Sequence, residues 1–300
     1  MTLRLATRMK RGLVAGLLAL TLPFAAWAQT PVPAQADWVA ARQSVTLPSG
    51  QALSFVEIGA PDGLPLILLH GFTDNSRSWS LLAPHLPDRR IIAIDLRGHG
   101  GSAAPACCYG VDAMVDDLRG FMDLQNIAEA DLVGHSLGSI VAGSFAGLYP
   151  GRVNRLVLIS AAAAVPAAAN DWLWDTVPVQ PRPLDPDSQF MLDWYWNPTP
   201  VDDDFLTRER GESAATPEDV WLGVMRAFSL TDWSPLARQI EDPVLILWGD
   251  QDGLFGAETQ DALRALLPDA QHETYAGLGH NMFWEQSAEV GALITGFLTQ

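Results

Sequence analysis

The chain has 300 residues, of which 48% are apolar, and a formal net charge of −17 at pH 7. This length and composition fit one α/β domain with an insertion and argue against a disordered chain. So acidic a surface repels nucleic acid and anionic lipid, and because no basic patch offsets it we expect neither as a partner.

Residues 1–28 have the pattern of a secretory signal peptide. Four basic residues within positions 4–11 precede an apolar run over residues 12–24, and a small-x-small cleavage pattern ends at Ala28. A membrane anchor is the alternative, but the apolar run is shorter than the roughly 20 residues that span a bilayer. We expect cleavage after Ala28, a periplasmic or secreted mature protein, and no membrane-spanning segment.

Cleavage changes the charge and the chemistry of the mature chain. It removes four positive charges and no negative one, which moves the formal net charge from −17 to −21. It also removes Lys10, the only lysine of the sequence. Without lysine, a Schiff-base mechanism, a pyridoxal enzyme and a phosphate-binding P-loop are all excluded. We expect neither a cofactor nor a metal ion.

Strands and helices alternate from residue 45 onward, after a flexible N-terminal tether over residues 29–44 that is rich in alanine and proline. The expected strands are residues 52–58, 65–70, 90–95, 131–135, 155–160, 244–249 and 272–275. The expected helices are residues 78–86, 111–124, 137–149, 258–267 and 287–298. Continuous apolar runs are typical of strands buried on both faces. The alternation predicts an α/β fold with a doubly wound, mostly parallel sheet, formed by residues 45–160 and 236–300.

Two adjacent cysteines, Cys107 and Cys108, are the only ones in the chain. Export would place them in an oxidising compartment, where cysteines pair. Adjacent Cα atoms lie only about 3.80 Å apart, below the range that disulfides favour. A strained vicinal disulfide and two free thiols are therefore both open.

Residues 134–138, Gly-His-Ser-Leu-Gly, follow an expected strand and open an expected helix. This is the setting of the G-x-S-x-G elbow, whose tight turn leaves room only for glycine on both sides of the nucleophile. Ser136 is the predicted nucleophile, held in a strained conformation above the N-terminus of the helix.

Two backbone N–H groups are expected to stabilise the negative charge that develops on a substrate oxygen. One belongs to Leu137, the residue after the nucleophile. The other belongs to Phe72, in the turn after strand 65–70, where Gly71 lets the backbone turn inward.

The alternation stops over residues 161–235, which are rich in proline and hold six of the ten tryptophans that follow residue 28. An insertion at this point predicts a cap over the carboxyl edge of the sheet, where ligands of such sheets bind. Trp172 and Trp174 are two residues apart, as are Trp194 and Trp196, so neither pair can share one helix face. Some of these four rings are expected to line an apolar cleft above Ser136. The alternative is that they only pin the insertion onto the core.

A serine nucleophile needs a base and a group that orients the base. His280 lies in a loop between the last expected strand and the last helix, at the same edge of the sheet as Ser136. The chain order serine, acid, histidine places the acid in the loop after strand 244–249. Asp252 lies deeper in that loop and is the preferred acid, whereas Asp250 is expected to brace the turn.

These residues together resemble the α/β-hydrolase superfamily, in its capped, single-chain branch of esterases, epoxide hydrolases, dehalogenases and cofactor-free haloperoxidases. The resemblance runs from Val45 to the C-terminus and is carried by residues 70–72, 95–100, 134–138, 249–252 and 279–280. It implies the α/β-hydrolase fold with a helical cap insertion. Residues 95–100 form a structural turn in such proteins, so no chemical role is expected for Arg97 and His99.

The resemblance implies hydrolysis of carboxylic esters of neutral, apolar small molecules through an acyl-Ser136 intermediate, with His280 as base and acid and Asp252 holding its tautomer. Dehalogenases and epoxide hydrolases of this branch carry aspartate as nucleophile, so Ser136 argues against both. The enzymatic alternative on the same triad is a carbon–carbon bond hydrolase, or an enzyme like the cofactor-free haloperoxidases and perhydrolases. A catalytically silent receptor or carrier is the alternative outside enzymes, although no triad member is missing.

Overall fold

The structure is a computed structural model that describes residues 29–86 and 89–300. The predicted signal peptide, residues 1–28, lies outside the described residues, so its cleavage stays a prediction. In the part of the chain that is described, no helix is both long and apolar enough to cross a bilayer.

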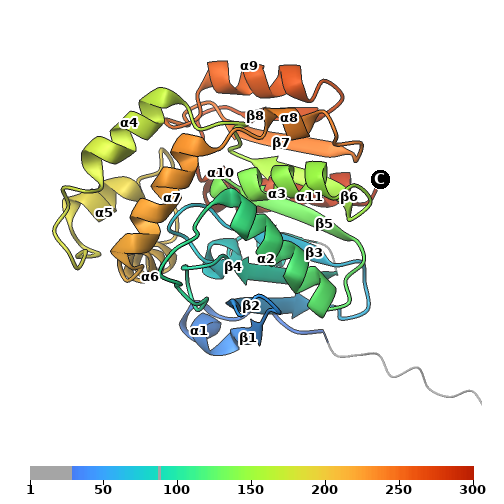
Figure 1. Cartoon of the computed structure of the whole chain (residues 1–300), viewed down its shortest axis with the longest axis horizontal. Coiled ribbons are helices and arrows are strands. Elements are labelled where there is room, and N and C mark those ends of the chain that lie inside the picture. The colour runs from blue at the N-terminus through green and yellow to red at the C-terminus, as the bar shows by residue number, and fades with distance from the viewer. Residues whose placement is uncertain (1–28, 87–88) are drawn as a thin grey trace, which may run out of the picture.

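One sheet of eight strands forms the centre of the molecule (Figure 1), in the order β1-β2-β4-β3-β5-β6-β7-β8. β1 pairs antiparallel with β2, β2 pairs antiparallel with β4, and every other pair is parallel. The strands are β1 (Gln43–Thr46), β2 (Ala52–Gly59), β3 (Leu66–Leu69), β4 (Arg90–Asp95), β5 (Ala130–His135), β6 (Val153–Ile159), β7 (Val244–Gly249) and β8 (Gln271–Tyr275). The predicted doubly wound, mostly parallel sheet is confirmed.

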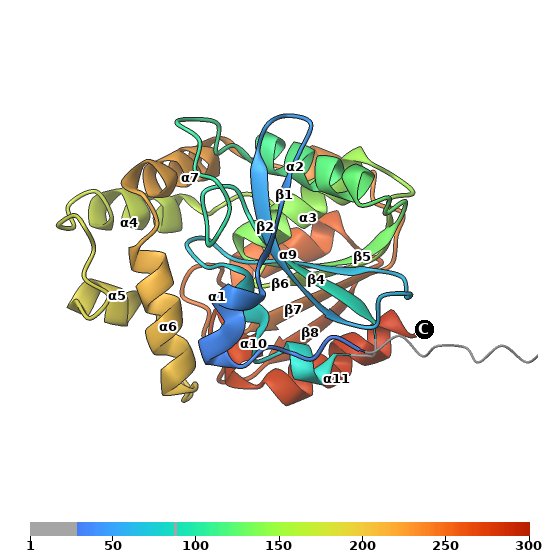
Figure 2. The same cartoon turned by 90° about the horizontal axis from the view of Figure 1, so that it is seen from below.

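Helices cover both faces of this sheet. Figure 2 shows α2 (Val111–Leu124) and α3 (Leu137–Leu148) on one face and α11 (Ser287–Leu298) on the other. Because both faces are covered, β3, β5 and β7 are buried along their whole length, which explains the unbroken apolar sequences of β3 and β7. α9 (Ala257–Leu266) and the short α10 (Met282–Glu285) complete the described core after β7.

The cap lies between β6 and β7, at the carboxyl edge of the parallel strands (Figure 1). It consists of α4 (Ala167–Thr176), α5 (Gln189–Trp194), α6 (Asp203–Ala214) and α7 (Glu218–Leu230). All four helices fall within residues 161–235, the range expected for the cap. The next helix, α8 (Ser234–Ala237), packs on α3, where a Cβ at Gly147 would lie 2.8 Å from Leu236 Cβ. α8 therefore belongs to the core.

Residues 29–44 do not form a flexible tether, contrary to the expectation. They include the 3-10 turn η1 (Gln35–Asp37), the single-turn helix α1 (Trp38–Ala41) and the start of β1. Trp38 is fully buried, and its Nε1 donates to Ser76 Oγ at 3.1 Å. Arg42 Nε lies 3.1 Å from the buried carboxylate of Asp95. Burial of a large aromatic ring and a paired charge hold this segment on the core.

The expected helix over residues 78–86 is also wrong. The chain instead makes two short 3-10 turns, η2 (Ser76–Trp79) and η3 (Ala83–His85). The Asn75 side chain accepts from Arg77 N at 2.9 Å and caps the first turn. Pro84 has no N–H to continue an α-helical ladder, so only a short turn forms there.

Cys107 and Cys108 are joined by a vicinal disulfide, with Cα atoms 3.8 Å apart. Arg97 donates to the Cys108 carbonyl oxygen at 2.6 Å and forms a buried ion pair with Asp117. Arg97 thus fixes this loop onto α2, in keeping with the structural role expected for it.

Candidate active site

Ser136 lies in the sharp turn between β5 and α3, with φ 49° and ψ −115°. A Cβ at Gly134 would overlap the carbonyl oxygen of Gly138, and a Cβ at Gly138 would overlap that of Leu69. Glycine is therefore required on both sides of Ser136. A left-handed serine is strained and persists only because its surroundings fix it. This is the geometry predicted from residues 134–138.

His280 and Asp252 are directly bonded. His280 Nδ1 lies 2.9 Å from Asp252 Oδ2, while Asp252 Oδ1 accepts from the N–H groups of Leu254 and Phe255 at 2.9 and 3.1 Å. The Asp252 side chain is fully buried. A carboxylate bound to Nδ1–H leaves Nε2 as the acceptor nitrogen of a neutral imidazole, which is the tautomer that a general base needs.

Asp250, the other candidate acid, does not contact His280. Its side chain is exposed and accepts from Gly277 N at 2.7 Å. Hydrogen bonds from Gln251 and Gly277 lower the pKa of Asp250. It braces the two loops that end β7 and β8, as expected for it.

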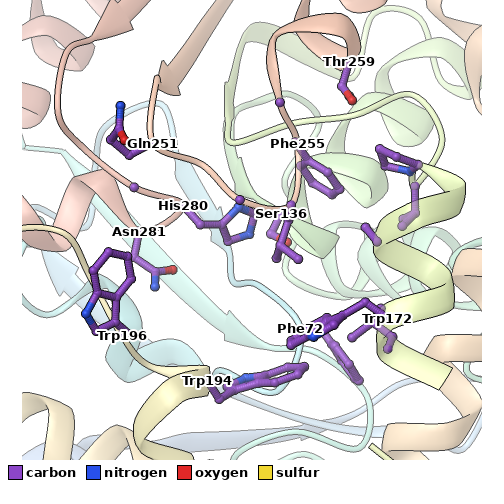
Figure 3. A pocket seen from close by; sticks show the side chains of 18 of the residues that line it. Phe72, Ser136, Trp172, Trp194, Trp196, Gln251, Phe255, Thr259, His280 and Asn281 are labelled. Atoms are coloured by element: carbon purple, nitrogen blue, oxygen red, sulfur yellow. The ribbon is translucent and has the colours of Figure 1, made fainter. Parts of the chain in front are cut away.

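Ser136 and His280 face one cavity, and Figure 3 shows them at its centre. No hydrogen bond joins the two side chains in this conformation of the described chain. Such contacts are often long in the absence of substrate and tighten when it binds. The His280 carbonyl oxygen accepts from Ser160 Oγ at 2.7 Å and lies 3.1 Å from His135 Nε2. Ser160 and His135, which the sequence analysis did not single out for this role, therefore hold the histidine loop against β5 and β6.

Phe72 and Leu137 have backbone N–H groups that donate to no other described residue. Leu137 is the first residue of α3, and its side chain is fully buried in the core. Phe72 follows β3, and its ring lines the cavity. Its ring packs edge-on against Trp194, Trp221 and Phe228, with centroids 5.3 to 5.8 Å apart. Neither N–H group has an acceptor within the described chain, as is expected of oxyanion-hole donors.

The cavity has a volume of about 650 Å³ and lies between the sheet edge and the cap. Most of its large side chains are aromatic. These are Phe72, Trp172, Trp194, Tyr195, Trp196, Phe228, Phe255 and Trp284. Its carboxyl groups are Asp74, Asp193 and Glu258, and no lysine or arginine is among the described residues that line it. The lining is apolar, aromatic and acidic.

Three of the four tryptophans expected in the cleft line it. Trp172 stacks on Trp194 with ring centroids 5.8 Å apart, and Trp196 is 67% exposed at the rim. Trp174 is the exception, since its Nε1 donates to Ser229 Oγ of α7 at 3.2 Å and its ring packs against the hydrophobic core. Trp174 is two positions from Trp172 on α4, so it points to another side of that helix.

Asp74 is a cavity residue that the sequence analysis missed. It is almost fully buried, accepts from the Tyr195 hydroxyl at 3.0 Å, and its Oδ2 lies 3.8 Å from His135 Nδ1. Burial raises the pKa of Asp74 to about 7. Its position two residues after Phe72 was the only available signal, because its partners lie far away in the sequence.

A family model described as "alpha/beta hydrolase fold" matches residues 65–287. The chain belongs to the α/β-hydrolase family. This match includes the elbow, the Asp252 loop and His280, and leaves out only the segment before β3 and most of α11. As an α/β hydrolase, the protein belongs to a family of hydrolytic enzymes.

Similar α/β hydrolases carry out different reactions. The 2-hydroxy-6-oxo-2,4-heptadienoate hydrolase of Pseudomonas putida is 27% identical over 274 residues, which cover 85% of this chain and 95% of that protein. Lipase 3 of a Moraxella species is 26% identical, with 79% of this chain and 78% of the lipase covered. The crystal structure of E-2-(acetamidomethylene)succinate hydrolase is 25% identical, with a TM-score of 0.75, and covers 86% of this chain and 99% of its own. The family therefore fixes the fold, and the substrate must be argued from the site itself.

Proposed function

We propose that this α/β hydrolase is an exported serine esterase that cleaves carboxylic esters of neutral, apolar small molecules. The observation that supports this most is the Asp252–His280 hydrogen bond at the cavity that also holds Ser136 on its strained elbow. A buried acid, an oriented imidazole and a projecting hydroxyl are the parts that acyl transfer requires.

In the first half of the proposed reaction, Ser136 Oγ attacks the ester carbonyl carbon while His280 Nε2 takes the hydroxyl proton. The N–H groups of Phe72 and Leu137 stabilise the resulting oxyanion. His280 then gives its proton to the leaving alcohol, and the acyl group stays on Ser136. In the second half, a water attacks the acyl carbon with His280 again as base, which releases the acid and restores Ser136. Asp252 stays ionised and stabilises the transient imidazolium.

The cavity lining supports the proposed substrate class. Aromatic rings exclude water and contact an apolar or aromatic group. Because the lining residues include carboxyl groups and no arginine or lysine, a substrate carboxylate would find no cationic partner. This disfavours the dienoate substrates named for the Pseudomonas putida relative, although carbon–carbon bond hydrolysis remains the second candidate because of that similarity.

The test compares esters with other substrates on one preparation. A panel of p-nitrophenyl esters from acetate to long acyl chains should be hydrolysed, with medium-length or aromatic acyl groups preferred. Ser136→Ala and His280→Ala should each lose turnover while unfolding at nearly the wild-type temperature, since the two groups act as one unit. Ser144→Ala, which changes a buried serine of the same helix outside the cavity, is the matched control. If the wild-type protein hydrolyses no ester but cleaves 2-hydroxy-6-oxo-2,4-heptadienoate, the result favours the carbon–carbon bond hydrolase. If it cleaves neither kind of substrate, the result favours a catalytically silent carrier.

The proposed location is outside the cytoplasm. The pattern over residues 1–28 and the Cys107–Cys108 disulfide support it, because disulfides persist mainly in oxidising compartments. Cell fractionation and N-terminal sequencing test it, with Gln29 expected as the first residue of the mature protein.

A further inference from the structure

The segment that follows Phe72 is bonded to the cap at four of its residues. Trp194 Nε1 donates to Thr73 Oγ1 at 3.0 Å, and the Tyr195 hydroxyl donates to Asp74 Oδ1 at 3.0 Å. Two further contacts are Asn75 N to Glu209 Oε1 at 3.3 Å and Arg77 Nε to Glu212 Oε1 at 2.8 Å. Two consecutive cap residues at the end of α5 thus hold the two residues that directly follow a predicted oxyanion-hole donor.

Thr73 needs such support because of its backbone. Its φ is 70°, in the left-handed region, which is a genuine outlier for a β-branched residue. A conformation of this kind persists only when the surrounding structure fixes it. Trp194 bonds to the Thr73 hydroxyl and packs edge-on against the Phe72 ring, with centroids 5.8 Å apart. Figure 3 shows Trp194 and Phe72 on the same side of the cavity.

Asp74 is held from two sides. Tyr195 binds one carboxyl oxygen, and the other lies 3.8 Å from His135 Nδ1, next to the nucleophile. A Cβ at Gly71 would lie 2.7 Å from His135 Nδ1 and 2.8 Å from Asp74 Oδ2, so glycine there is what allows this approach. Tyr195 is itself fully buried beside Asp74 and Glu209, which raises its pKa well above the usual range and keeps it a hydroxyl donor.

We propose that Trp194 and Tyr195 are positioning residues for the oxyanion hole: they fix Thr73 and Asp74 and thereby aim the Phe72 N–H at the substrate oxygen. This inference rests on the proposed esterase function. The cap then takes part in transition-state stabilisation as well as in substrate selection. A displaced donor weakens the transition state more than the ground state. Its loss should therefore lower kcat, with KM unchanged, and to the same degree for short and long esters.

The main variant is Tyr195→Phe, which keeps the ring and removes the hydroxyl. We expect kcat to fall by about tenfold for acetate and octanoate esters alike, with KM within twofold of wild type, because a small displacement of a catalytic group is costly. Inhibition by a trifluoromethyl ketone, whose tetrahedral adduct places an oxyanion in the hole, should weaken by about the same factor. The matched control is Tyr149→Phe, whose hydroxyl contacts Asp116 at 3.4 Å on the surface, and it should change none of these values.

A second measurement does not depend on turnover. Hydrogen exchange of peptides covering residues 70–77 should be faster in Tyr195→Phe than in wild type, with peptides from α2 unchanged. If wild type hydrolyses no ester while exchange accelerates as expected, the proposed function fails and the positioning of the loop stands. A change in KM alone, a loss that grows with acyl length, or exchange and kcat both equal to wild type would overturn the proposal.

Discussion

Asp250 and Asp252 show how surroundings decide the role of a carboxyl group. Both lie in one loop after β7, yet Asp252 is buried against His280 and Asp250 is exposed. Asp252→Asn would favour the wrong tautomer of His280. The amide oxygen would accept from the N–H groups of Leu254 and Phe255, so the NH2 group would face His280 Nδ1, donate to it and leave the ring proton on Nε2. We expect kcat to fall on the order of 10⁴-fold, as in serine proteases.

Asp250→Asn is the natural control for that variant. It should lower kcat by less than about threefold, since it loses only a surface brace. Steady-state kinetics on one p-nitrophenyl ester measures both variants. A larger loss at Asp250 than at Asp252 would overturn the assignment of the acid.

Asp74 predicts a dependence of stability on pH. Its pKa is raised to about 7 in the folded protein, mainly by burial, against about 3.9 for an unfolded aspartate. Because the folded state holds the proton more tightly, the stability that this group contributes is complete below pH 4 and is lost as the pH rises through 7. The Asp74→Asn variant has no titrating group at this position, so its stability does not contain this pH-dependent contribution. The melting temperature of Asp74→Asn relative to wild type should therefore rise between pH 5 and pH 8.

The size of that rise measures the contribution of Asp74 protonation to the free energy of unfolding, at about 2–4 °C for each kcal/mol in a chain of this length. Asparagine can still accept from Tyr195, and the facing groups His135 and Glu209 are common to both proteins. Melting curves at several pH values provide the measurement. A relative melting temperature that stays flat or falls with pH would show that Asp74 is ionised in the folded protein at pH 5.

The tryptophans of α4 and of the segment after α5 differ in whether they line the cleft, and we expect them to differ in their effect on substrate selection. Trp196 lies exposed at the rim and Trp174 lies outside the cavity. Trp196→Ala should lower kcat/KM by about three- to tenfold for aromatic or medium-chain esters and spare acetate, because one aromatic contact contributes about 0.5–1.5 kcal/mol. Trp174→Ala should destabilise the cap without changing the order of substrate preference. Equal losses for all esters in Trp196→Ala would show that this ring only supports the cap.

The elements that the sequence predicted well are those with a strong local signal. Residues 111–124 bury an apolar stripe at helical spacing, and the predicted bounds of α2 agree with the structure. The turn at Ser136 could be predicted equally well, since two glycines flank it between a strand and a helix. These features depend on neighbours in the chain.

The features that the sequence did not reveal depend on distant contacts. Trp38 orders the N-terminal segment by packing on the core beside Ser76, and nothing near it in the sequence marks that burial. Asp74 meets Tyr195 across 121 positions of the chain. Trp172 and Trp174 differ in role because they lie on different sides of α4: Trp172 lines the cleft, and Trp174 bonds to Ser229 outside it. Composition identifies an aromatic cap, but only the packing of its helices says which rings face the substrate.

Export of the protein and its vicinal disulfide are linked, because export would place both cysteines in an oxidising compartment. If the protein folds outside the cytoplasm, Cys107 and Cys108 should both be oxidised. Native protein purified from its own host should then take up no alkylating reagent without reductant and two equivalents after reduction, as read from intact mass. Two alkylated thiols in the untreated protein would argue against both the bridge and the oxidising compartment.

We propose that the Ser136–His280–Asp252 arrangement turns over esters through an acyl group on Ser136. Rapid mixing of wild-type protein with a p-nitrophenyl ester, acid quenching and peptide mass spectrometry test it most directly. We predict a burst of p-nitrophenol near one equivalent per protein where deacylation is slow, and the acyl mass on the peptide that holds Ser136. His280→Ala should show neither. An acyl group on another residue, or undiminished turnover by Ser136→Ala, would show that Ser136 is not the nucleophile.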